Sequence, residues 1–244
     1  MEFFWFIEQN ILWILLGAVV IGILALSIRA NFAFDKYIEM RDKYSLTLSS
    51  LAISAKSLGE KLSAIHFSGL IKIESAKDDG PDGTYIPKTQ TVKIKTQFLN
   101  SSSISAISIL AHEFGHAVQH FQNPKILIKH QNLNNFVKFL GNLNPLIVIL
   151  SVVLGITLSY LWALVGLGVI FLSTIVAISL KAQTSHVEKN ASVEAIKLLQ
   201  NFGFSDADIL GAKKFLNSAK NTYTADFLCA LLGWTGLTRK TNYF

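Results

Sequence analysis

Charge and cysteine are what this chain has little of. Only 16% of its 244 residues are charged, whereas a typical soluble domain carries about 25%. Apolar residues make up 51%, and the mean hydropathy is +0.42. This composition excludes a disordered chain, a coiled coil and an ordinary cytosolic enzyme, and it favours a protein partly immersed in lipid. The length is enough for one catalytic domain with a sizeable core.

Cysteine occurs once, as Cys229. A single cysteine excludes an intramolecular disulfide and any zinc cluster built on cysteines. The net charge of +6 comes from scattered lysines and arginines, with no nucleic-acid-binding motif beside them. Nucleic acid is therefore not an expected partner.

The first long apolar run covers residues 11–28, which contain no charge. As a helix this run would be about 27 Å long, close to the thickness of a bilayer core. A cleaved signal peptide is disfavoured, because Glu2 and Glu8 stand where positive residues belong. Residues 1–28 are therefore predicted to be an N-terminal transmembrane anchor.

The second apolar run lies between Lys138 and Lys181, where no residue is charged. As one helix it would be about 63 Å long, twice the thickness of a bilayer core. The prediction is a transmembrane helical hairpin over residues 139–180, which turns near residues 159–162. The alternative is a pair of buried helices in a soluble domain.

Lysine and arginine are distributed unevenly around these runs. None precedes Arg29, fourteen lie from Arg29 to Lys138, and eight lie from Lys181 onward. By the positive-inside rule, residues 29–138 and 181–244 should both face the cytoplasm, with the N-terminus outside. We therefore expect a multi-pass protein of the cell membrane with its catalytic part on the cytoplasmic side.

Hydrophobic periodicity assigns elements to the segment 29–138. Apolar residues at helical spacing predict an amphipathic helix over residues 50–66. Residues 70–73 and 91–96 alternate apolar with polar, which indicates strands, and residues 78–83 have turn chemistry. Lys93 and Lys95 share one face, which favours an exposed or edge strand. Serines at 101–103 can cap a helix that begins near Ile104. The expected fold class is a mainly α membrane protein. In it, a helix with the motif H-E-x-x-H at residues 112–116, hence zincin-like, and a small β-hairpin or edge strand accompany transmembrane helices.

The helix predicted after Ser103 contains the motif H-E-x-x-H at residues 112–116. His112 and His116 lie one turn apart on one face, so both imidazoles can reach a single zinc ion. Glu113 points about 100° away from them. It is therefore placed to act as a general base on a zinc-activated water, and not as a ligand.

A third zinc ligand has to come from another part of the chain, since catalytic zinc usually takes three protein ligands. His120 lies about 12 Å along the helix from His112, which is too far to share the ion. A helical segment after the second apolar run supplies three candidates: Glu188, Glu194 and His186.

The chain resembles the YugP-like family of membrane-embedded neutral zinc metallopeptidases over nearly its whole length. The similarity is carried by an N-terminal apolar run, the H-E-x-x-H helix, the second apolar run and short matching segments: Lys43-Tyr44-Ser45, Tyr85 with Pro87, Thr91–Lys95, 188–192 and 211–217. In that family the glutamate of an E-F-D-A-S-like segment is the third zinc ligand. The resemblance implies this role for Glu188 and a zinc site at His112, His116 and Glu188.

Three departures from the family pattern stand out. The family's aspartate is replaced by Asn190, which can orient a ligand by hydrogen bonding but adds no charge. A polar D-H-Y-D-P-like turn is represented by residues 83–87, without its acids and its histidine. The last family helix is apolar, whereas Lys220, Asn221 and Asp226 interrupt residues 218–237.

The expected function is hydrolysis of peptide bonds by a membrane-anchored, gluzincin-like zinc metallopeptidase that acts on peptide or protein substrates. An extended substrate could add to the strand at residues 91–95. The alternative is a catalytically silent membrane scaffold that retains a structural metal or none, which the change at Asn190 and the altered turn favour.

Overall fold

The computed structural model describes residues 2–77 and 81–232. Helices make up most of this part of the chain, namely α1 (Glu2–Ser45), α2 (Ala55–Phe67), α3 (Thr96–Leu99), α4 (Ile104–Gln122), α5 (Pro124–Thr157), α6 (Tyr160–Phe202) and α7 (Asp206–Leu232). The strands are β1 (Lys72–Ala76), β2 (Gly83–Ile86) and β3 (Thr91–Lys95), with a short 3-10 helix at Pro87–Thr89.

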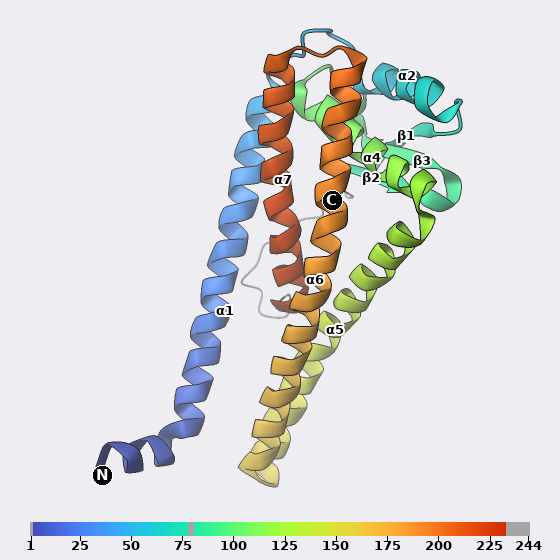
Figure 1. Cartoon of the computed structure of the whole chain (residues 1–244). Helices are drawn as coiled ribbons and strands as arrows, with labels where there is room; N and C mark the ends of the chain where they lie inside the picture. The colour runs from blue at the N-terminus through green and yellow to red at the C-terminus, as the bar shows by residue number, and fades with distance from the viewer. Residues whose placement is uncertain (1, 78–80, 233–244) are drawn as a thin grey trace.

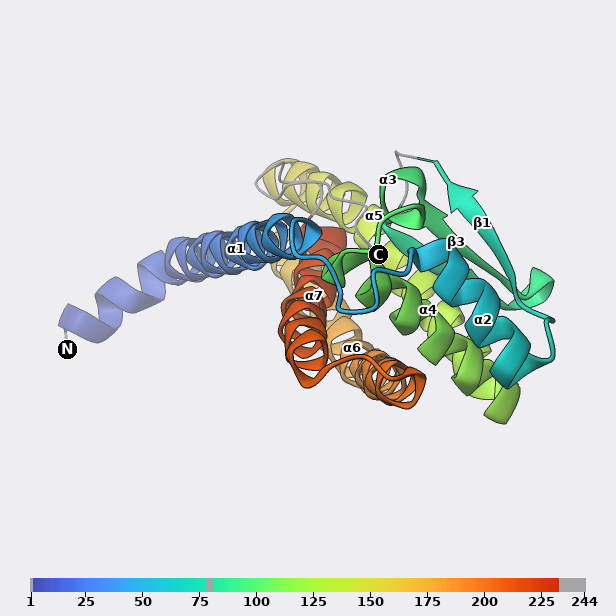
Figure 2. The same ribbon diagram turned by 90° about the horizontal axis from the view of Figure 1, so that it is seen from above.

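The long helices α1, α5, α6 and α7 lie lengthwise in the molecule, and the sheet gathers with α2 and α4 at one end (Figure 1). α5 packs along α6, and α1 packs along α7. Seen from above, α2, α4 and the sheet form one compact group beside the long helices (Figure 2). Contacts between α4 and α6 join the two parts.

The sheet has the strand order β1-β3-β2, in which β3 is parallel to β1 and antiparallel to β2. The prediction of an edge strand at residues 91–95 is therefore wrong, because β3 is the central strand. Val92 and Ile94 are fully buried, and the Lys95 side chain that suggested an edge is buried with a partner of opposite charge. The Lys95 ammonium lies 2.8 Å from the buried Asp82 carboxylate. The edge strand next to α4 is β2. It lies within residues 83–87, which were expected to form an altered version of a family turn.

A buried polar cluster fixes the start of β2 against α1. The Asp82 carboxylate accepts hydrogen bonds from the Lys95 ammonium and the Tyr37 hydroxyl, both at 2.8 Å. Arg41 lies 3.8 Å from the same carboxylate. Because a buried carboxylate is stable only with such partners, Asp82 ties β2 to both α1 and β3.

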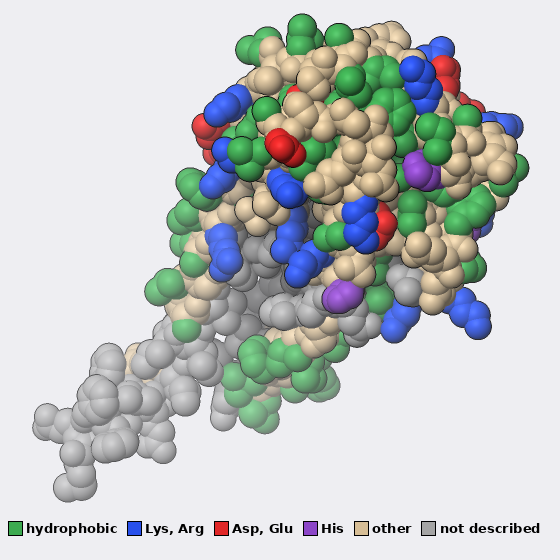
Figure 3. All heavy atoms as spheres, turned by 45° about the horizontal axis from the view of Figure 1, so that its top comes forward, with side chains coloured by type: hydrophobic (Ala, Val, Ile, Leu, Met, Phe, Trp, Pro, Cys, Tyr) green, Lys and Arg blue, Asp and Glu red, His purple; other side chains and the backbone are tan. Residues whose placement is uncertain are grey.

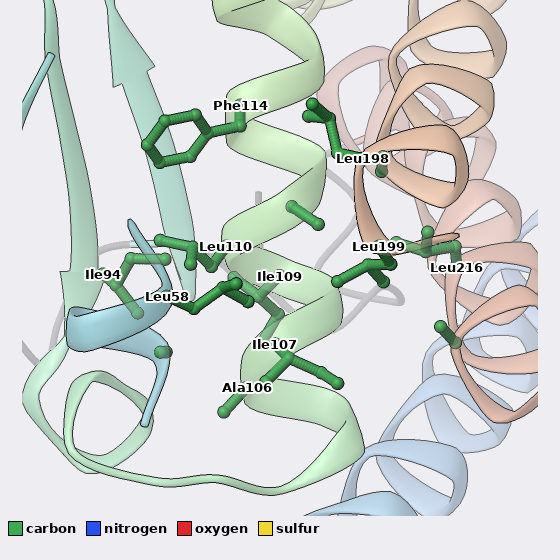
Figure 4. Packing of buried hydrophobic residues seen from close by; sticks show 14 of the residues in the cluster. Leu58, Ile94, Ala106, Ile107, Ile109, Leu110, Phe114, Leu198, Leu199 and Leu216 are labelled. Carbon is green, nitrogen blue, oxygen red and sulfur yellow. The ribbon is translucent and has the colours of Figure 1, made fainter. Parts of the chain in front are cut away.

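Helix α4 is the centre of the hydrophobic core (Figure 4). Leu110 and Phe114 lie on the side of the sheet and α2, whereas Leu198 and Leu199 of α6 pack on the opposite side. The predicted cap is confirmed: the Ser103 hydroxyl accepts a hydrogen bond from the Ala106 amide at the start of α4. The helix predicted at residues 50–66 is found at Ala55–Phe67.

The expectation of transmembrane helices is wrong. In the part of the chain that the structure describes, none of the helices combines the length and the apolarity that crossing a membrane demands. Both properties must coincide in one helix, over about 20 consecutive residues. What remains of the expected fold class is a mainly helical protein with a small sheet.

Two expectations fall partly on residues that the structure does not describe. Residues 78–80 of the predicted turn lie outside the described residues, as do residues 233–237 of the interrupted segment 218–237. Within the described part, α7 continues as a helix to Leu232.

Candidate metal centre

The structure brings two buried histidines together on one face of α4. His112 and His116 are 2% and 9% exposed, and their ring centroids lie 4.8 Å apart. Both belong to the turns of α4 that are enclosed between the sheet and α6. This pairing follows directly from the four-residue spacing in a helix.

Glu188 reaches the two histidines from α6. Its Oε2 lies 3.3 Å from His112 Nε2 and 3.4 Å from His116 Nε2. One ligand atom from each of the three residues lies within 4.8 Å of the other two. Two imidazole nitrogens and a carboxylate oxygen that converge in this way form a donor set suited to zinc. The residues present therefore fit the metal.

The competing candidates lie elsewhere. His186 is exposed, and its Nδ1 contacts Asn190 at 3.2 Å. Glu194 forms an exposed ion pair with Lys197 at 2.7 Å. The Asn190 amide thus contacts His186 on the exposed face of α6, and not His112 or His116. The residue of this segment that contacts His112 is Ser192. An asparagine in place of the family's aspartate at residue 190 therefore takes no charge away from that contact.

The outer nitrogen of each histidine has a polar partner. His112 Nδ1 lies 3.2 Å from the Ser192 hydroxyl, and His116 Nδ1 lies 3.0 Å from Gln119 Oε1. Such contacts orient the ring and leave Nε2 directed at the point where the three residues converge. Neither partner was predicted from the sequence. Their only local signal is their helical spacing, Gln119 three residues after His116 and Ser192 four residues after Glu188.

Glu113 lies on the side of the centre that faces β2. It is buried, and the backbone N–H of Tyr85 donates a hydrogen bond to its carboxylate. Gly83 makes this approach possible, because a Cβ at residue 83 would lie 3.0 Å from Glu113 Cγ. Burial raises the pKa of Glu113, although His116 and His112 act in the opposite direction.

Charge couples the three converging residues. Burial on its own would lower the pKa of His116, but the Glu188 carboxylate outweighs it and raises that pKa to about 9. For Glu188, burial acts to raise the pKa, and the two histidines overcome it and hold the pKa well below its usual value. The site therefore favours a positive charge beside Glu188, which a divalent cation also supplies.

A second polar contact joins β2 to α4 near this centre. The Tyr85 hydroxyl lies 2.9 Å from His120 Nδ1, and burial raises the pKa of Tyr85 to about 12. His120, excluded as a zinc ligand by its distance along the helix, thus has a role in holding the strand against α4.

Comparison with known proteins identifies the relatives of this chain. Residues 11–239 match the model of a family described as "Putative neutral zinc metallopeptidase". The chain belongs to this family. The family expected from the resemblance is thereby confirmed, and zinc and a peptide or protein substrate are what membership suggests.

One curated relative is similar over most of both proteins. The chain is 30% identical over 212 residues to "Putative membrane protease YugP" of Bacillus subtilis (strain 168). The aligned region covers 86% of this chain and 89% of that protein. No solved structure matches the chain. The family, together with the converging His112, His116 and Glu188, points to zinc as the metal.

Proposed function

We propose that this protein is a zinc-dependent peptidase, with His112, His116 and Glu188 as metal ligands and Glu113 as the general base. The observation that carries the proposal is the convergence of three buried donors from α4 and α6, with both Nε2 atoms within 3.4 Å of one Glu188 oxygen. Zinc, when bound, supplies Lewis acidity that polarises a peptide carbonyl and acidifies a water molecule.

Glu113 is the group that moves the proton. Its carboxylate takes a proton from the attacking water and passes it to the leaving amine. Burial favours this role, because it raises the pKa of Glu113 toward the operating pH. The hydrogen bond from the Tyr85 N–H holds the carboxylate in place.

The substrate is proposed to bind in an extended form along β2. This strand pairs with β3 on one side. The Tyr85 N–H donates to Glu113, so it points to the outer edge of β2 and away from β3. In a strand the N–H and C=O groups of one residue point to the same edge, so the outer edge of β2 offers backbone groups beside the general base. An added peptide strand would place its backbone beside Glu113, in a mode that reads main chain more than side chains.

Metal analysis combined with a proteolysis assay tests this proposal. The purified protein should hold one zinc per chain, which is lost in Glu188→Ala and His116→Ala. Glu194→Ala is the matched control on α6, and it should keep the zinc. Glu113→Gln should retain zinc but lose hydrolysis of a quenched peptide substrate, since an amide cannot accept the proton. Full zinc occupancy in Glu188→Ala would exclude the ligand assignment.

The same variants separate the peptidase from the alternative of a silent scaffold. A scaffold would hold zinc or none and would hydrolyse no peptide at any zinc occupancy. Hydrolysis that depends on Glu113 excludes it.

We also propose that the protein associates with the cytoplasmic face of a lipid bilayer. The name of the relative supports a membrane location, and apolar side chains are exposed along α5 and α6, among them Leu146, Leu150, Leu161, Trp162 and Phe171. Hydrophobic side chains gather on the described surface at the far tip, where α5 turns into α6 (Figure 3). The net charge of +6 suits an anionic leaflet.

Flotation with lipid vesicles tests this association. The protein should float with anionic vesicles and float less with neutral ones, because the basic residues are attracted to anionic lipid. A Leu150→Asp/Trp162→Asp variant should float less than a control with Leu210→Asp, an exposed leucine at the opposite end of the helices. Equal flotation of the two variants would contradict the proposed face.

A further inference from the structure

Two side chains link the metal-site histidines to consecutive backbone carbonyls of α6. Gln119 contacts His116 Nδ1 with its Oε1, and its Nε2 donates to the Val187 carbonyl at 2.7 Å. Ser192 contacts His112 Nδ1, and its hydroxyl donates to the Glu188 carbonyl at 3.1 Å. Both links end beside Glu188, which is itself the third residue of the cluster.

The Val187 carbonyl determines how Gln119 is oriented. A carbonyl oxygen only accepts hydrogen bonds, so it must face the NH2 end of the amide. The Oε1 end of Gln119 then faces His116, and this oxygen also only accepts. His116 Nδ1 therefore has to carry the hydrogen of this contact.

Ser192 does the same for His112. Its hydroxyl has one hydrogen, which the Glu188 carbonyl can accept at 3.1 Å. In that arrangement the hydroxyl oxygen accepts the hydrogen of His112 Nδ1 at 3.2 Å. In both rings a hydrogen is thereby held on Nδ1, and Nε2 is the nitrogen that binds a metal ion once it has given up any hydrogen of its own.

From these contacts we infer that Gln119 and Ser192 are positioning residues that select the zinc-binding tautomers of His116 and His112 and hold α4 and α6 in register. The inference rests on the proposed zinc site and adds to it the residues that prepare the ligands. The polarity of each link comes from a helix backbone, so it is built into the fold before an ion arrives.

Zinc affinity, measured by competition with a chelator, tests the inference directly. Gln119→Leu and Ser192→Ala should each weaken zinc binding by about 10- to 100-fold, the usual effect of removing an outer partner of a ligand histidine. Gln119→Glu should bind zinc more tightly than Gln119→Leu, because a carboxylate still accepts the hydrogen from His116 Nδ1, although it loses the bond to the Val187 carbonyl. This rescue would not occur if the side chain served only to pack α4.

Matched controls are available on the same two helices. Ser179→Ala removes a hydroxyl of α6 that donates to the carbonyl four residues earlier, as Ser192 does, but contacts no histidine through any described bond. Gln122→Leu changes an exposed glutamine at the end of α4. Neither should alter zinc affinity. Thermal unfolding in the presence of chelator shows whether a variant is folded, and Ser192→Ala, which loses a single oxygen, keeps the test independent of Gln119→Leu.

The outcomes separate this inference from the proposed function. If the wild type binds zinc and both Gln119→Leu and Ser192→Ala bind it equally tightly, the positioning role is wrong and the zinc site stands. If the wild type itself binds no zinc, the proposed function fails and the inference fails with it.

Discussion

At the scale of single residues, His116 and Glu188 form the buried charge pair around which the site is organised. The pKa of His116 is raised from 6.5 to about 9, and that of Glu188 is lowered from 4.5. A raised histidine pKa contributes stability that is complete below pH 6.5 and is lost as the pH rises through about 9. A lowered glutamate pKa contributes stability above pH 4.5 that is lost in acid.

These two shifts predict how the stability of the chelator-treated protein depends on pH. Its free energy of unfolding should fall as the pH is raised from 6.5 to 9, because His116 loses the proton that pairs it with Glu188. The raised pKa of Glu113, caused by burial, also makes the stability fall as the pH rises above 4.5. Urea unfolding at a series of pH values measures this. His116→Ala is the control and should show a smaller decrease over that range, whereas an unchanged slope in this variant would assign the effect to other groups.

The sequence could identify some residues of the site and not others. His112, Glu113 and His116 follow from local spacing, because four residues make about one turn of a helix. Spacing alone left Glu194 and His186 in competition with Glu188 as the third ligand, and the resemblance to a family favoured Glu188. Gln119 and Ser192 carry no such signal, since their function depends on carbonyls of α6 that become neighbours of α4 only in the folded chain.

At the scale of elements, the site depends on how closely α4 approaches α6. Gly115 lies between Glu113 and His116, and a Cβ placed on it would overlap the carbonyl oxygen of Ala191. The carbonyl belongs to backbone, so it cannot move aside as a side chain can. Glu188 lies one turn before Ala191 on the same helix, so the contact at Gly115 sets the distance from Glu188 to both histidines.

Gly115→Ala should therefore weaken zinc binding by at least tenfold, although alanine favours a helix over glycine by about 1 kcal/mol. The added methyl group pushes α6 away from α4 and moves Glu188 with it. Gly168→Ala is the matched control, because Gly168 is also helical and has no neighbouring atom within 4 Å of its added Cβ. Chelator competition measures both variants. Wild-type affinity in Gly115→Ala would show that the helices can separate without moving the ligand.

The elements of the sheet show why the fold was only partly predictable. Alternation located β3, but it could not tell an edge strand from a central one, because Lys95 is buried through its pairing with Asp82. β2 was missed because residues 83–86 are a strand only by pairing with β3. The helix α4 was well predicted because its serine cap and its H-E-x-x-H motif agree within one segment.

At the scale of the whole molecule, the proposed ion would connect parts that are distant in the sequence. His112 and His116 belong to α4, which packs against the sheet, and Glu188 belongs to α6, which also contacts α5 and α7. α7 in turn packs along α1. A ligand that joins α4 to α6 therefore holds the sheet end and the long helices together, so the free energy of zinc binding should appear in global unfolding.

Zinc should accordingly raise the unfolding temperature of the whole protein in a single transition. A ligand present at 1,000 times its dissociation constant adds about 4 kcal/mol to the stability of the folded state. In a chain of this size, each kcal/mol raises the melting temperature by about 2–4 °C, so the expected rise is about 8–16 °C. Glu113→Gln should show the same rise, because it keeps all three ligands, and Glu188→Ala should show almost none. Differential scanning calorimetry with and without zinc measures this, and a rise in Glu188→Ala as large as in the wild type would place the ion at a site that does not join α4 to α6.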